Sequence, residues 1–424
     1  MAQRGIREFD GKKMLANHWA EYISKDFSFP GKVVLVDPET KLDELAKEHS
    51  WLGKEKLVVK PDQLFGKRGK HGLIAANVSF DEAKEWIAER MNKETTVGKV
   101  TDTLTHFIIE SYVPHDKEFY VAIKSAREGD TIYFSNHGGV DIESVWDTVA
   151  EINVAITEDV DKIDIEGKLP KDTPKENKKM LADFIKGLFR FYRNLGYAYL
   201  EINPFVISGK DIVPLDLVAR IDDTAVFEFM SGWGDLKFPP PFGRKVSEEE
   251  AYIKRLDNKS GASLKLTVLN PKGRIWTMVA GGGSSVIYAD TIVDLGYRDE
   301  LANYGEYSGN PSTDETYEYA KTVLDLMTRE KDAKGRTKLL LIGGGIANFT
   351  DVAKTFKGII MALREYKDKL KGVDARIYVR RGGPNYQEGL ENMKKLGEEL
   401  GLPIEVYGPE THMTRIVNMA LEAS

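Results

Sequence analysis

The chain has 424 residues, more than one ordinary hydrophobic core accommodates, so two or three domains are expected. Its 42% hydrophobic and 30% charged residues are typical of a soluble globular protein, and the formal charge of −7 argues against nucleic-acid binding through a broad basic face. Cysteine is absent and no run approaches the roughly 20 apolar residues of a membrane span, which excludes disulfides, thiolate chemistry and a spanning helix and predicts a cytoplasmic protein.

Short strands and amphipathic helices alternate at the start of the chain. Apolar residues at three- and four-residue spacing predict helices, and short apolar runs predict strands. The expected elements are a helix over Gly11–Ile23, strands over Lys32–Val36 and Leu57–Val59, a helix over Phe80–Met91 and a strand over Phe107–Val113.

A loop of glycines and basic residues follows the strand at Leu57–Val59. Lys60 ends that strand, and the loop continues to Gly72. Lysine point charges, a forked guanidinium from Arg68 and close backbone approach at Gly69 suit a chain of phosphates. The G-x-x-x-x-G-K-[ST] spacing of a Walker A loop is missing, and a solvated basic hairpin is the alternative.

The next segment contains two candidate residues for contact with a nucleotide or its phosphoryl group, Glu110 and His137, and a predicted hairpin between them. Glu110 interrupts an apolar strand, and such a segment either presents backbone carbonyls to an adenine or is an ordinary edge strand. Glu118–Lys124 and Thr131–Phe134 are predicted to pair as a hairpin. In the loop that follows, His137 is a candidate phosphoryl acceptor, although a polar loop histidine is favoured.

A long core helix is predicted next, with no chemistry assigned to it. Thr173, Pro174 and Glu176 have the spacing of a helix start with a capping box. Gly196 is expected to end the helix.

Oxygen ligands lie on two predicted neighbouring strands, Tyr199–Phe205 and Ile212–Leu217. Asn203 and Asp216 would supply hard ligands that suit Mg2+ shared with nucleotide phosphates. Glu201 points to the same face as Asn203, because strand residues two apart share a face. Carboxylates in apolar surroundings need a cation or a donor, so a structural salt bridge is the alternative to a metal.

A stiff linker separates the two halves of the chain. Trp233–Gly243 contains three prolines and flanking glycines, so domains are expected at residues 1–243 and 244–424. A charged helix over Ser247–Leu256 follows.

The second half repeats a strand, a glycine turn and a helix, which predicts an α/β fold with an open, doubly wound parallel sheet. Ligands in such folds bind outside the carboxyl ends of the strands. The expected strands are Ile275–Val279, Leu339–Ile342, Arg376–Arg380 and Ile404–Tyr407, with helices from Val286, after Thr350, from Tyr386 and after Pro409.

Glycine loops and an arginine are expected to converge at one end of this sheet. Strand, glycine turn and helix start together direct backbone N–H groups at an anion, although a tight turn in the core is the alternative. Arg380 and Arg381 end the third strand, and alternation lets only one of them face a given side. A guanidinium there offers a fork that matches a carboxylate, so a small, multiply anionic ligand is implied. No G-x-G-x-x-G fingerprint is present, which disfavours a nicotinamide cofactor. The anion loops are Gly281, Gly282, Gly283, Gly344 and Gly345, and Asn348 and Thr350 stand at the helix start.

Several motifs match a known family. Glu201-Ile202-Asn203-Pro204 with Asp216 resembles the metal-binding pair of the ATP-grasp β subunits of succinyl-CoA synthetase. The resemblance to the ATP-citrate lyase family is closer and extends over nearly the whole chain. It is carried by Val58–Leu64, Asn270–Gly283, Glu300–Gly309, Ile346–Thr350 and Val379–Gly389.

The resemblance implies an N-terminal ATP-grasp domain followed by a citrate-binding, flavodoxin-like domain of the succinyl-CoA synthetase type. It assigns residues to ATP, Mg2+, a further cation and citrate, and gives Glu201 the role of steadying a phosphohistidine on a partner subunit. The ATP residues are Lys60, Arg68, Gly69, Ser111, Val113 and Glu118, beside Glu110; the Mg2+ ligands are Asn203 and Asp216; the further cation has Asp257, Ser260 and Ala262; citrate has Gly309, Asn348, Thr350, Tyr366 and Arg381.

The implied function is that of one subunit of a heteromeric ATP-citrate lyase. The partner subunit would carry the phosphohistidine, the main CoA site and a citrate-synthase-like cleavage module, while this chain binds Mg-ATP and citrate. The nearest alternative is a citryl-CoA synthetase subunit, which stops at citryl-CoA. Another ADP-forming acid-CoA ligase and a non-catalytic sensing subunit are the remaining alternatives.

Overall fold

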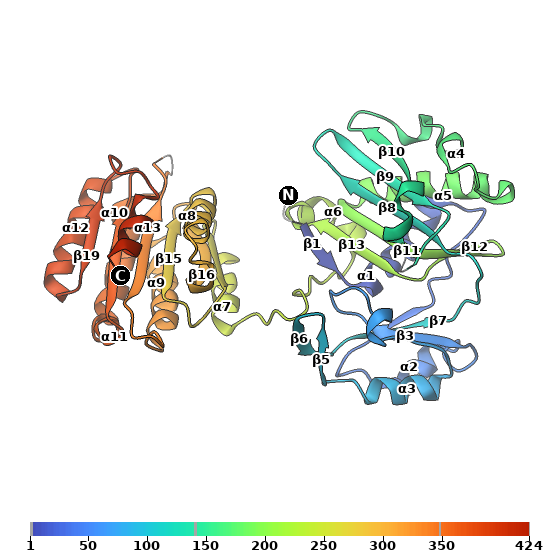
Figure 1. The fold of residues 1–424 in the computed structure, drawn as a ribbon, viewed down its shortest axis with the longest axis horizontal. Helices are drawn as coiled ribbons and strands as arrows, with labels where there is room; N and C mark the ends of the chain where they lie inside the picture. Colours follow the sequence, from blue (N-terminus) through green and yellow to red (C-terminus); the bar gives the residue numbers. More distant parts are fainter. Residues whose placement is uncertain (1–2, 140–141, 347–348, 424) are drawn as a thin grey trace. The chain divides into compact units, whose positions relative to one another are not determined.

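The computed structural model describes residues 3–139, 142–346 and 349–423. By its internal contacts the chain divides into two compact units, Met1–Lys245 and Val246–Ser424 (Figure 1). Within the described residues, no helix has the length and apolar character needed to cross a membrane.

The first unit contains two antiparallel sheets and a small hairpin of β5 (Glu94–Val97) and β6 (Val100–Thr103). The larger sheet has the order β1-β13-β11-β8-β9-β10, with β12 beside β11, and the smaller has the order β2-β7-β3-β4. The larger sheet is formed by β1 (Gln3–Ile6), β8 (Phe119–Ser125), β9 (Gly129–Ser135), β10 (Ala150–Ala155), β11 (Tyr197–Ser208), β12 (Asp211–Pro214) and β13 (Leu217–Asp222). The smaller is formed by β2 (Val33–Val36), β3 (Leu57–Pro61), β4 (Ala75–Val78) and β7 (Phe107–Ser111).

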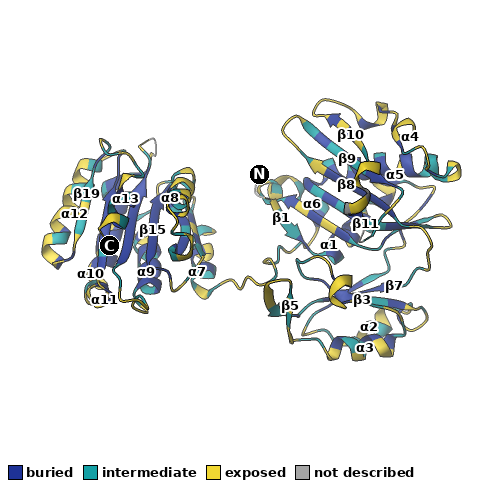
Figure 2. Ribbon diagram, in the orientation of Figure 1, coloured by how far each residue is buried: buried dark blue, intermediate teal, exposed yellow. Residues whose placement is uncertain are grey.

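Each of these sheets buries one face under helices, as the alternation of side chains along a strand allows (Figure 2). The larger sheet packs against α1 (Glu8–Asn17) and α5 (Lys175–Asn194). The smaller packs against α2 (Leu42–Glu48) and α3 (Phe80–Ala88). The unit also contains the short α4 (Ile165–Lys168) and α6 (Val226–Trp233).

The second unit is built on a parallel sheet of order β15-β17-β18-β19. Buried side chains form one cluster with α9, α10 and α12 on one face and another with α8 and α13 on the other face, so the expected doubly wound sheet is confirmed. The strands are β15 (Ile275–Ala280), β17 (Lys338–Gly344), β18 (Ala375–Arg380) and β19 (Ile404–Tyr407). The helices are α7 (Glu248–Asp257), α8 (Gly282–Asp294), α9 (Thr313–Thr328), α10 (Val352–Glu365), α11 (Lys367–Gly372), α12 (Tyr386–Leu400) and α13 (Arg415–Glu422).

A further strand, β16 (Asn303–Ser308), runs beside β15 and pairs with β14 (Ser263–Val268). The side-chain amide of Asn303 accepts a hydrogen bond from the N–H of Thr277 on β15 at 2.8 Å and donates one to the Thr277 carbonyl at 2.9 Å. The chain therefore leaves β15 through α8 to one side and returns through α9 to β17 on the other. The switch point of this flavodoxin-like order lies between the carboxyl ends of β15 and β17, where ligands bind in such folds.

Three expected helix starts differ from the structure. The capping box at Thr173 is wrong, because the buried Thr173 hydroxyl donates to Asn136 at 3.1 Å and α5 begins at Lys175. The helix expected from Gly11 begins at Glu8, and the helix expected from Val286 begins at Gly282. In the last case the glycines themselves form the first turn, after Gly281 at φ 98°.

Candidate functional site

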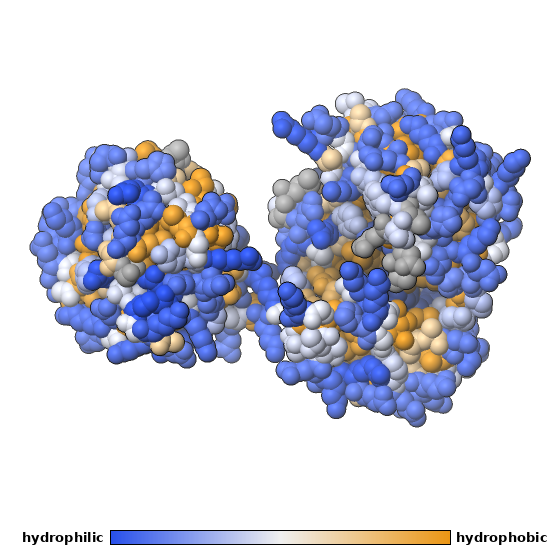
Figure 3. All heavy atoms as spheres, in the orientation of Figure 1, coloured by the Kyte–Doolittle hydropathy of each residue, from blue (hydrophilic) through white to orange (hydrophobic). Residues whose placement is uncertain are grey.

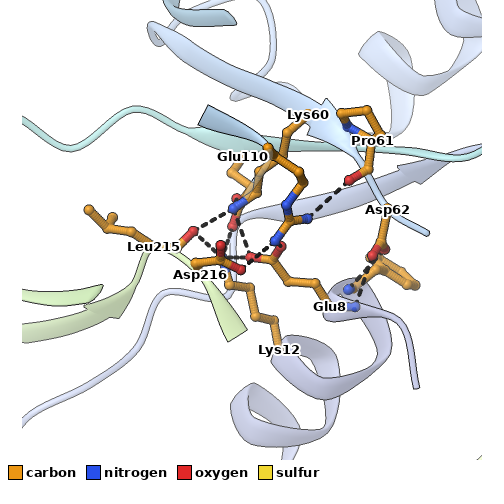
Figure 4. A network of polar contacts seen from close by, with 10 residues as sticks. Glu8, Lys12, Lys60, Pro61, Asp62, Glu110, Leu215 and Asp216 are labelled. Atoms are coloured by element: carbon orange, nitrogen blue, oxygen red, sulfur yellow. Dashed lines mark hydrogen bonds and ion pairs between the residues drawn. The ribbon is translucent and has the colours of Figure 1, made fainter. Parts of the chain in front are cut away.

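Six charged side chains form a network in the first unit, at the face of the smaller sheet that α2 and α3 do not cover (Figure 4). Leu57 and Val59 of β3 face the helices, so Lys60 points the opposite way. Glu110 of β7 lies on this same face, because Phe107 and Ile109 face the core and strand residues alternate. The charge network consists of Glu8, Lys12, Lys60, Arg68, Glu110 and Asp216.

Lys60 is 3% exposed and contacts two carboxylates, Glu8 at 2.8 Å and Glu110 at 3.0 Å. Its ammonium also donates to the carbonyl of Leu215. Burial opposes its charge, but the two carboxylates outweigh burial and raise the pKa of Lys60 above its usual range. Lys12 contacts the same two carboxylates, so the buried cations and anions alternate.

Glu8 is the centre of the charge network. Burial disfavours its charge, but Lys12 at 2.7 Å, Lys60 at 2.8 Å and Arg68 at 2.7 Å together hold the pKa of Glu8 well below its ordinary value. Arg68 donates in addition to the carbonyl of Pro61 at 3.0 Å and contacts Asp216. The two predicted phosphate-binding cations are therefore brought together, and a carboxylate that the sequence did not indicate lies between them.

Asp62 fixes the helix that carries Glu8. Its carboxylate accepts hydrogen bonds from the backbone N–H groups of Glu8 at 2.9 Å and Phe9 at 3.0 Å, so it caps α1 from outside the helix. Burial and the neighbouring charge of Glu8, opposed by Arg68, raise the pKa of Asp62 from 3.8 to about 6.

The two predicted metal ligands are neighbours. The Asn203 N–H donates to the Asp216 carbonyl at 3.0 Å, and the Asn203 side-chain oxygen accepts from Gly139 N–H at 2.7 Å. The Asp216 side chain is 36% exposed and contacts Arg68. Carboxylate and amide oxygens fit Mg2+. Among the described residues, no group of three or more histidine and acidic side chains is arranged so that it could hold a metal ion by itself.

Glu201 lies on the same strand, two residues from Asn203. Its carboxylate accepts a hydrogen bond from the Tyr199 hydroxyl. Leu200 and Ile202 belong to the core cluster, so Glu201 points to the opposite, more polar face of the larger sheet.

The other predicted ATP residues are arranged less tightly. Gly69 is exposed, and a Cβ there would meet only Ile74 at 3.7 Å, so the close backbone approach expected at Gly69 is not required by the protein itself. Ser111 donates to Glu55. His115 lies between the Val113 carbonyl at 2.7 Å and Glu118 at 3.2 Å. His115 and Glu118 line a cavity of about 450 Å³ that also contains the exposed His137.

A second candidate site lies in the other unit, at the carboxyl ends of β17 and β18. Arg381 is fully buried and donates to the Gly345 carbonyl at 3.1 Å. Its Nε and Nη2 have no hydrogen-bond partner among the described residues. Burial lowers the pKa of Arg381, and unmatched buried guanidinium N–H groups of this kind are costly without an acceptor.

Two tyrosine hydroxyls share this region. Those of Tyr288 and Tyr307 are buried and, within the described part of the chain, have no hydrogen-bond partner. A Cβ on Gly343 would lie 2.5 Å from the Tyr288 hydroxyl, and one on Gly344 would lie 2.4 Å from Arg381 Nη1, so the two side chains flank the end of β17. Burial raises the pKa of Tyr288 to about 12, so it is a neutral donor.

The glycine loops do converge here. A Cβ on Gly345 would lie 3.1 Å from Ser284 in the first turn of α8, which directs uncapped N–H groups toward the switch point. α8 leaves Val286 and Ile287 exposed, and Figure 3 shows apolar surface over this helix. Gly282 lies beside the Glu306 carboxylate, so this helix start already faces one negative charge.

The structure distributes the remaining predicted citrate and cation residues over several places. Asn348 lies outside the described residues, and Thr350 is buried just before α10. Tyr366 is not brought to this site. It follows the C-terminal end of α10, which is about 20 Å long, and its hydroxyl donates to Asp325 at 3.4 Å.

Asp257 ends α7, Ser260 and Ala262 lie in the turn that follows, and Gly309 packs against this turn. The Asp257 carboxylate accepts from Leu264 N–H at 2.9 Å and pairs with Lys265. The predicted further cation would therefore compete with a lysine that the protein already supplies.

The functional residues that the sequence did not reveal are mostly partners from distant segments. Glu8 and Lys12 have i,i+4 spacing, a weak signal for an ion pair. Tyr288 and Tyr307 have the pattern of ordinary core aromatics, and no signal in the sequence separates them from such residues.

Comparison with known proteins finds a family match for each of the two units. The model of the ATP-citrate synthase ATP-grasp domain matches residues 2–233, and the ATP citrate lyase citrate-binding model matches residues 244–423. The chain is 51% identical to ATP-citrate synthase alpha chain protein 2 of Oryza sativa subsp. japonica, over 100% of this chain and 99% of the relative. The solved ATP citrate lyase of Methanothrix soehngenii with citrate and coenzyme A has a TM-score of 0.88 and 56% identity, covering 99% of this chain and 100% of that one.

Some relatives are much longer. The chain is 52% identical to the ATP-citrate synthase of Bos taurus over 423 residues, 99% of this chain, but it spans only 38% of that protein's length. The identity extends along both units, and so do the family models. The chain belongs to the ATP-citrate synthase family.

Proposed function

We propose that this chain is the ATP- and citrate-binding subunit of a cytoplasmic, heteromeric ATP-citrate lyase. Residues 1–243 bind Mg-ATP and residues 244–424 bind citrate. The lyase converts ATP, citrate and CoA into ADP, phosphate, acetyl-CoA and oxaloacetate. The alternatives of a citryl-CoA synthetase, another acid-CoA ligase or a sensing subunit are less well supported, because the relatives that match the whole chain are ATP-citrate synthases or lyases.

Arg381 is the observation that carries the citrate assignment. A buried guanidinium with two unmatched nitrogens, beside two unmatched tyrosine hydroxyls, requires a polar ligand with several acceptors. A tricarboxylate supplies them, and the N–H groups at the start of α8 add favourable electrostatics for an anion. Gly309 and Thr350 complete the proposed site, and Asn348 belongs to the same loop. Tyr366 is not included in the proposed site, because it lies at the opposite end of α10 from Thr350.

Lys60 and Arg68 carry the nucleotide assignment. Their head groups are close together, and Asp216, a hard oxygen ligand, is in contact with Arg68. Asn203 and Asp216 would hold Mg2+, which supplies charge neutralisation to the nucleotide phosphates when bound. Ser111, Val113 and Glu118 would hold the rest of the nucleotide, the first two through their backbones.

The reaction requires a phosphoryl acceptor and a CoA site on a partner subunit. ATP would phosphorylate a histidine of that subunit while Glu201 steadies it, and the phosphoryl group would pass to citrate to give citryl phosphate. CoA would then displace phosphate, and the cleavage module of the partner would divide citryl-CoA into acetyl-CoA and oxaloacetate.

The test is product analysis of the complex formed by this chain and its partner subunit, with Mg-ATP, citrate and CoA. Acetyl-CoA that requires all three substrates supports the proposal. A reaction that stops at citryl-CoA indicates the synthetase, and no citrate-dependent ATP hydrolysis refutes both.

A further inference from the structure

One nitrogen of Arg68 is shared by two carboxylates. Its Nη2 lies 2.7 Å from Glu8 Oε2 and also contacts Asp216 Oδ1. The two acids differ in burial, because the Glu8 side chain is 2% exposed and the Asp216 side chain 36%. The Nη2 group of the residue proposed to hold phosphate therefore already faces two carboxylates.

The charge network as a whole has no surplus positive charge. Its three cations, Lys12, Lys60 and Arg68, face the three carboxylates of Glu8, Glu110 and Asp216. A polyphosphate approaching this balanced cluster gains little from long-range attraction. To contact the cations it has to take the place of one of the carboxylates.

Asp216 is the carboxylate that can leave. Glu8 contacts all three cations, and Glu110 contacts the two lysines. Both acids are buried, so moving either one away from its partners would leave buried charges without a counterion. Asp216 contacts one cation, Arg68, and is the most exposed of the three. It follows β12 near the exposed edge of the network rather than its centre.

We propose that Asp216 is a resident counterion of Arg68 which must leave the guanidinium before a polyphosphate can bind. This inference rests on the proposed function, in which the same carboxylate is a metal ligand. A divalent cation that takes Asp216 frees Arg68 for phosphate, so metal and phosphate binding are coupled through one ion pair. Without the metal, Asp216 excludes phosphate from Arg68.

The experiment compares binding of inorganic tripolyphosphate, in EDTA, to the full-length wild-type protein and to Asp216→Asn by calorimetry. Removing a partly exposed ion pair of about 1 kcal/mol should tighten metal-free binding about 5-fold. The same variant should bind Mg-ATP more weakly than the wild type. Asp130→Asn, which removes the partner of Arg193 elsewhere in the same unit, is the matched control and should change neither affinity.

A second experiment tests whether the tighter tripolyphosphate binding depends on the ion pair of Arg68 and Asp216. With Arg68→Gln already present, adding Asp216→Asn should no longer tighten tripolyphosphate binding, since the guanidinium that it would release is gone. Asp216→Ser replaces Asp216→Asn if thermal melting shows that the latter is unfolded.

Two failures can be told apart. A wild-type protein that does not bind Mg-ATP refutes the proposed function. A wild-type protein that binds Mg-ATP, together with variants that bind tripolyphosphate no tighter than the wild type, refutes only the counterion role of Asp216.

Discussion

The carboxylate of Asp62 accepts the backbone N–H of Glu8 at 2.9 Å, although the two residues are 54 positions apart. Asp62 comes directly after β3, the strand that carries Lys60, and Glu8 is the first residue of α1. The cap thus joins the strand that presents one cation to the helix that supplies its counterion. The residue before α1, Arg7, makes no side-chain cap of its own.

Loss of this cap should weaken nucleotide binding specifically. Asp62→Ala leaves two N–H groups at the start of α1 without their acceptor and should lower the free energy of unfolding by about 1–2 kcal/mol. It should also weaken Mg-ATP binding, because Glu8 no longer holds Lys60 in place. Calorimetry with citrate on the same protein is the internal control. Equal losses of both affinities would contradict a local role.

Asp62 should also give stability a particular pH dependence. Its folded pKa of about 6 lies above the ordinary 3.8, so the folded protein binds this proton more tightly than the unfolded chain. The contribution is complete below about pH 4 and is lost as the pH rises through 6. In urea unfolding from pH 4 to 7, the wild type should lose on the order of 2–3 kcal/mol relative to Asp62→Asn. A difference that is flat or of opposite sign would contradict the shift.

Arg381 and its neighbour Arg380 should separate ligand binding from stability. Arg381→Lys removes the guanidinium fork and should weaken citrate binding at least about 10-fold, as expected for charge-assisted hydrogen bonds. Mg-ATP binding should stay within about twofold. Arg380 donates to the carbonyls of Gly344, Pro409 and Thr411, so Arg380→Lys should lower stability instead. If Arg381→Lys weakens both ligands equally, its assigned role is wrong.

The packing of α9 on α10 should depend on Gly358. A Cβ there would lie 2.3 Å from the Thr313 carbonyl oxygen and 2.8 Å from the Tyr317 nitrogen, both backbone atoms. Gly358→Ala should therefore destabilise the protein by about 1–3 kcal/mol. Gly372→Ala in α11 is the control, since no atom lies within 4 Å of its Cβ position. A stabilising Gly358→Ala would contradict this helix contact.

The sequence predicted the framework better than the contacts of the site. Apolar runs placed the strands at Leu57 and Leu339 well, because a buried strand leaves a continuous local signal. The sequence identifies Lys60 and Arg381 as cations at strand ends and Arg68 as a cation in the loop that follows Lys60. Their partners are not identified, because Glu8 reaches Lys60 only through the tertiary fold, which brings the start of α1 next to the end of β3.

The contacts of the second site were equally hard to predict, for a similar reason. The position of Tyr366 followed from resemblance alone, whereas the length of α10 separates it from Thr350. Whether the hydroxyls of Tyr288 and Tyr307 find hydrogen-bond partners depends on the exact positions of these side chains inside the unit. A single sequence does not carry that information.

The central claim is that one chain holds separate sites for Mg-ATP and citrate. It is tested most directly by titrating the full-length protein with each ligand, in the wild type and in Asp216→Ala and Arg381→Lys. Asp216→Ala should strongly weaken Mg-ATP binding and preserve citrate binding, and Arg381→Lys should weaken citrate binding and preserve Mg-ATP binding. A wild-type protein that binds neither ligand, or variants that lose both together, would contradict it.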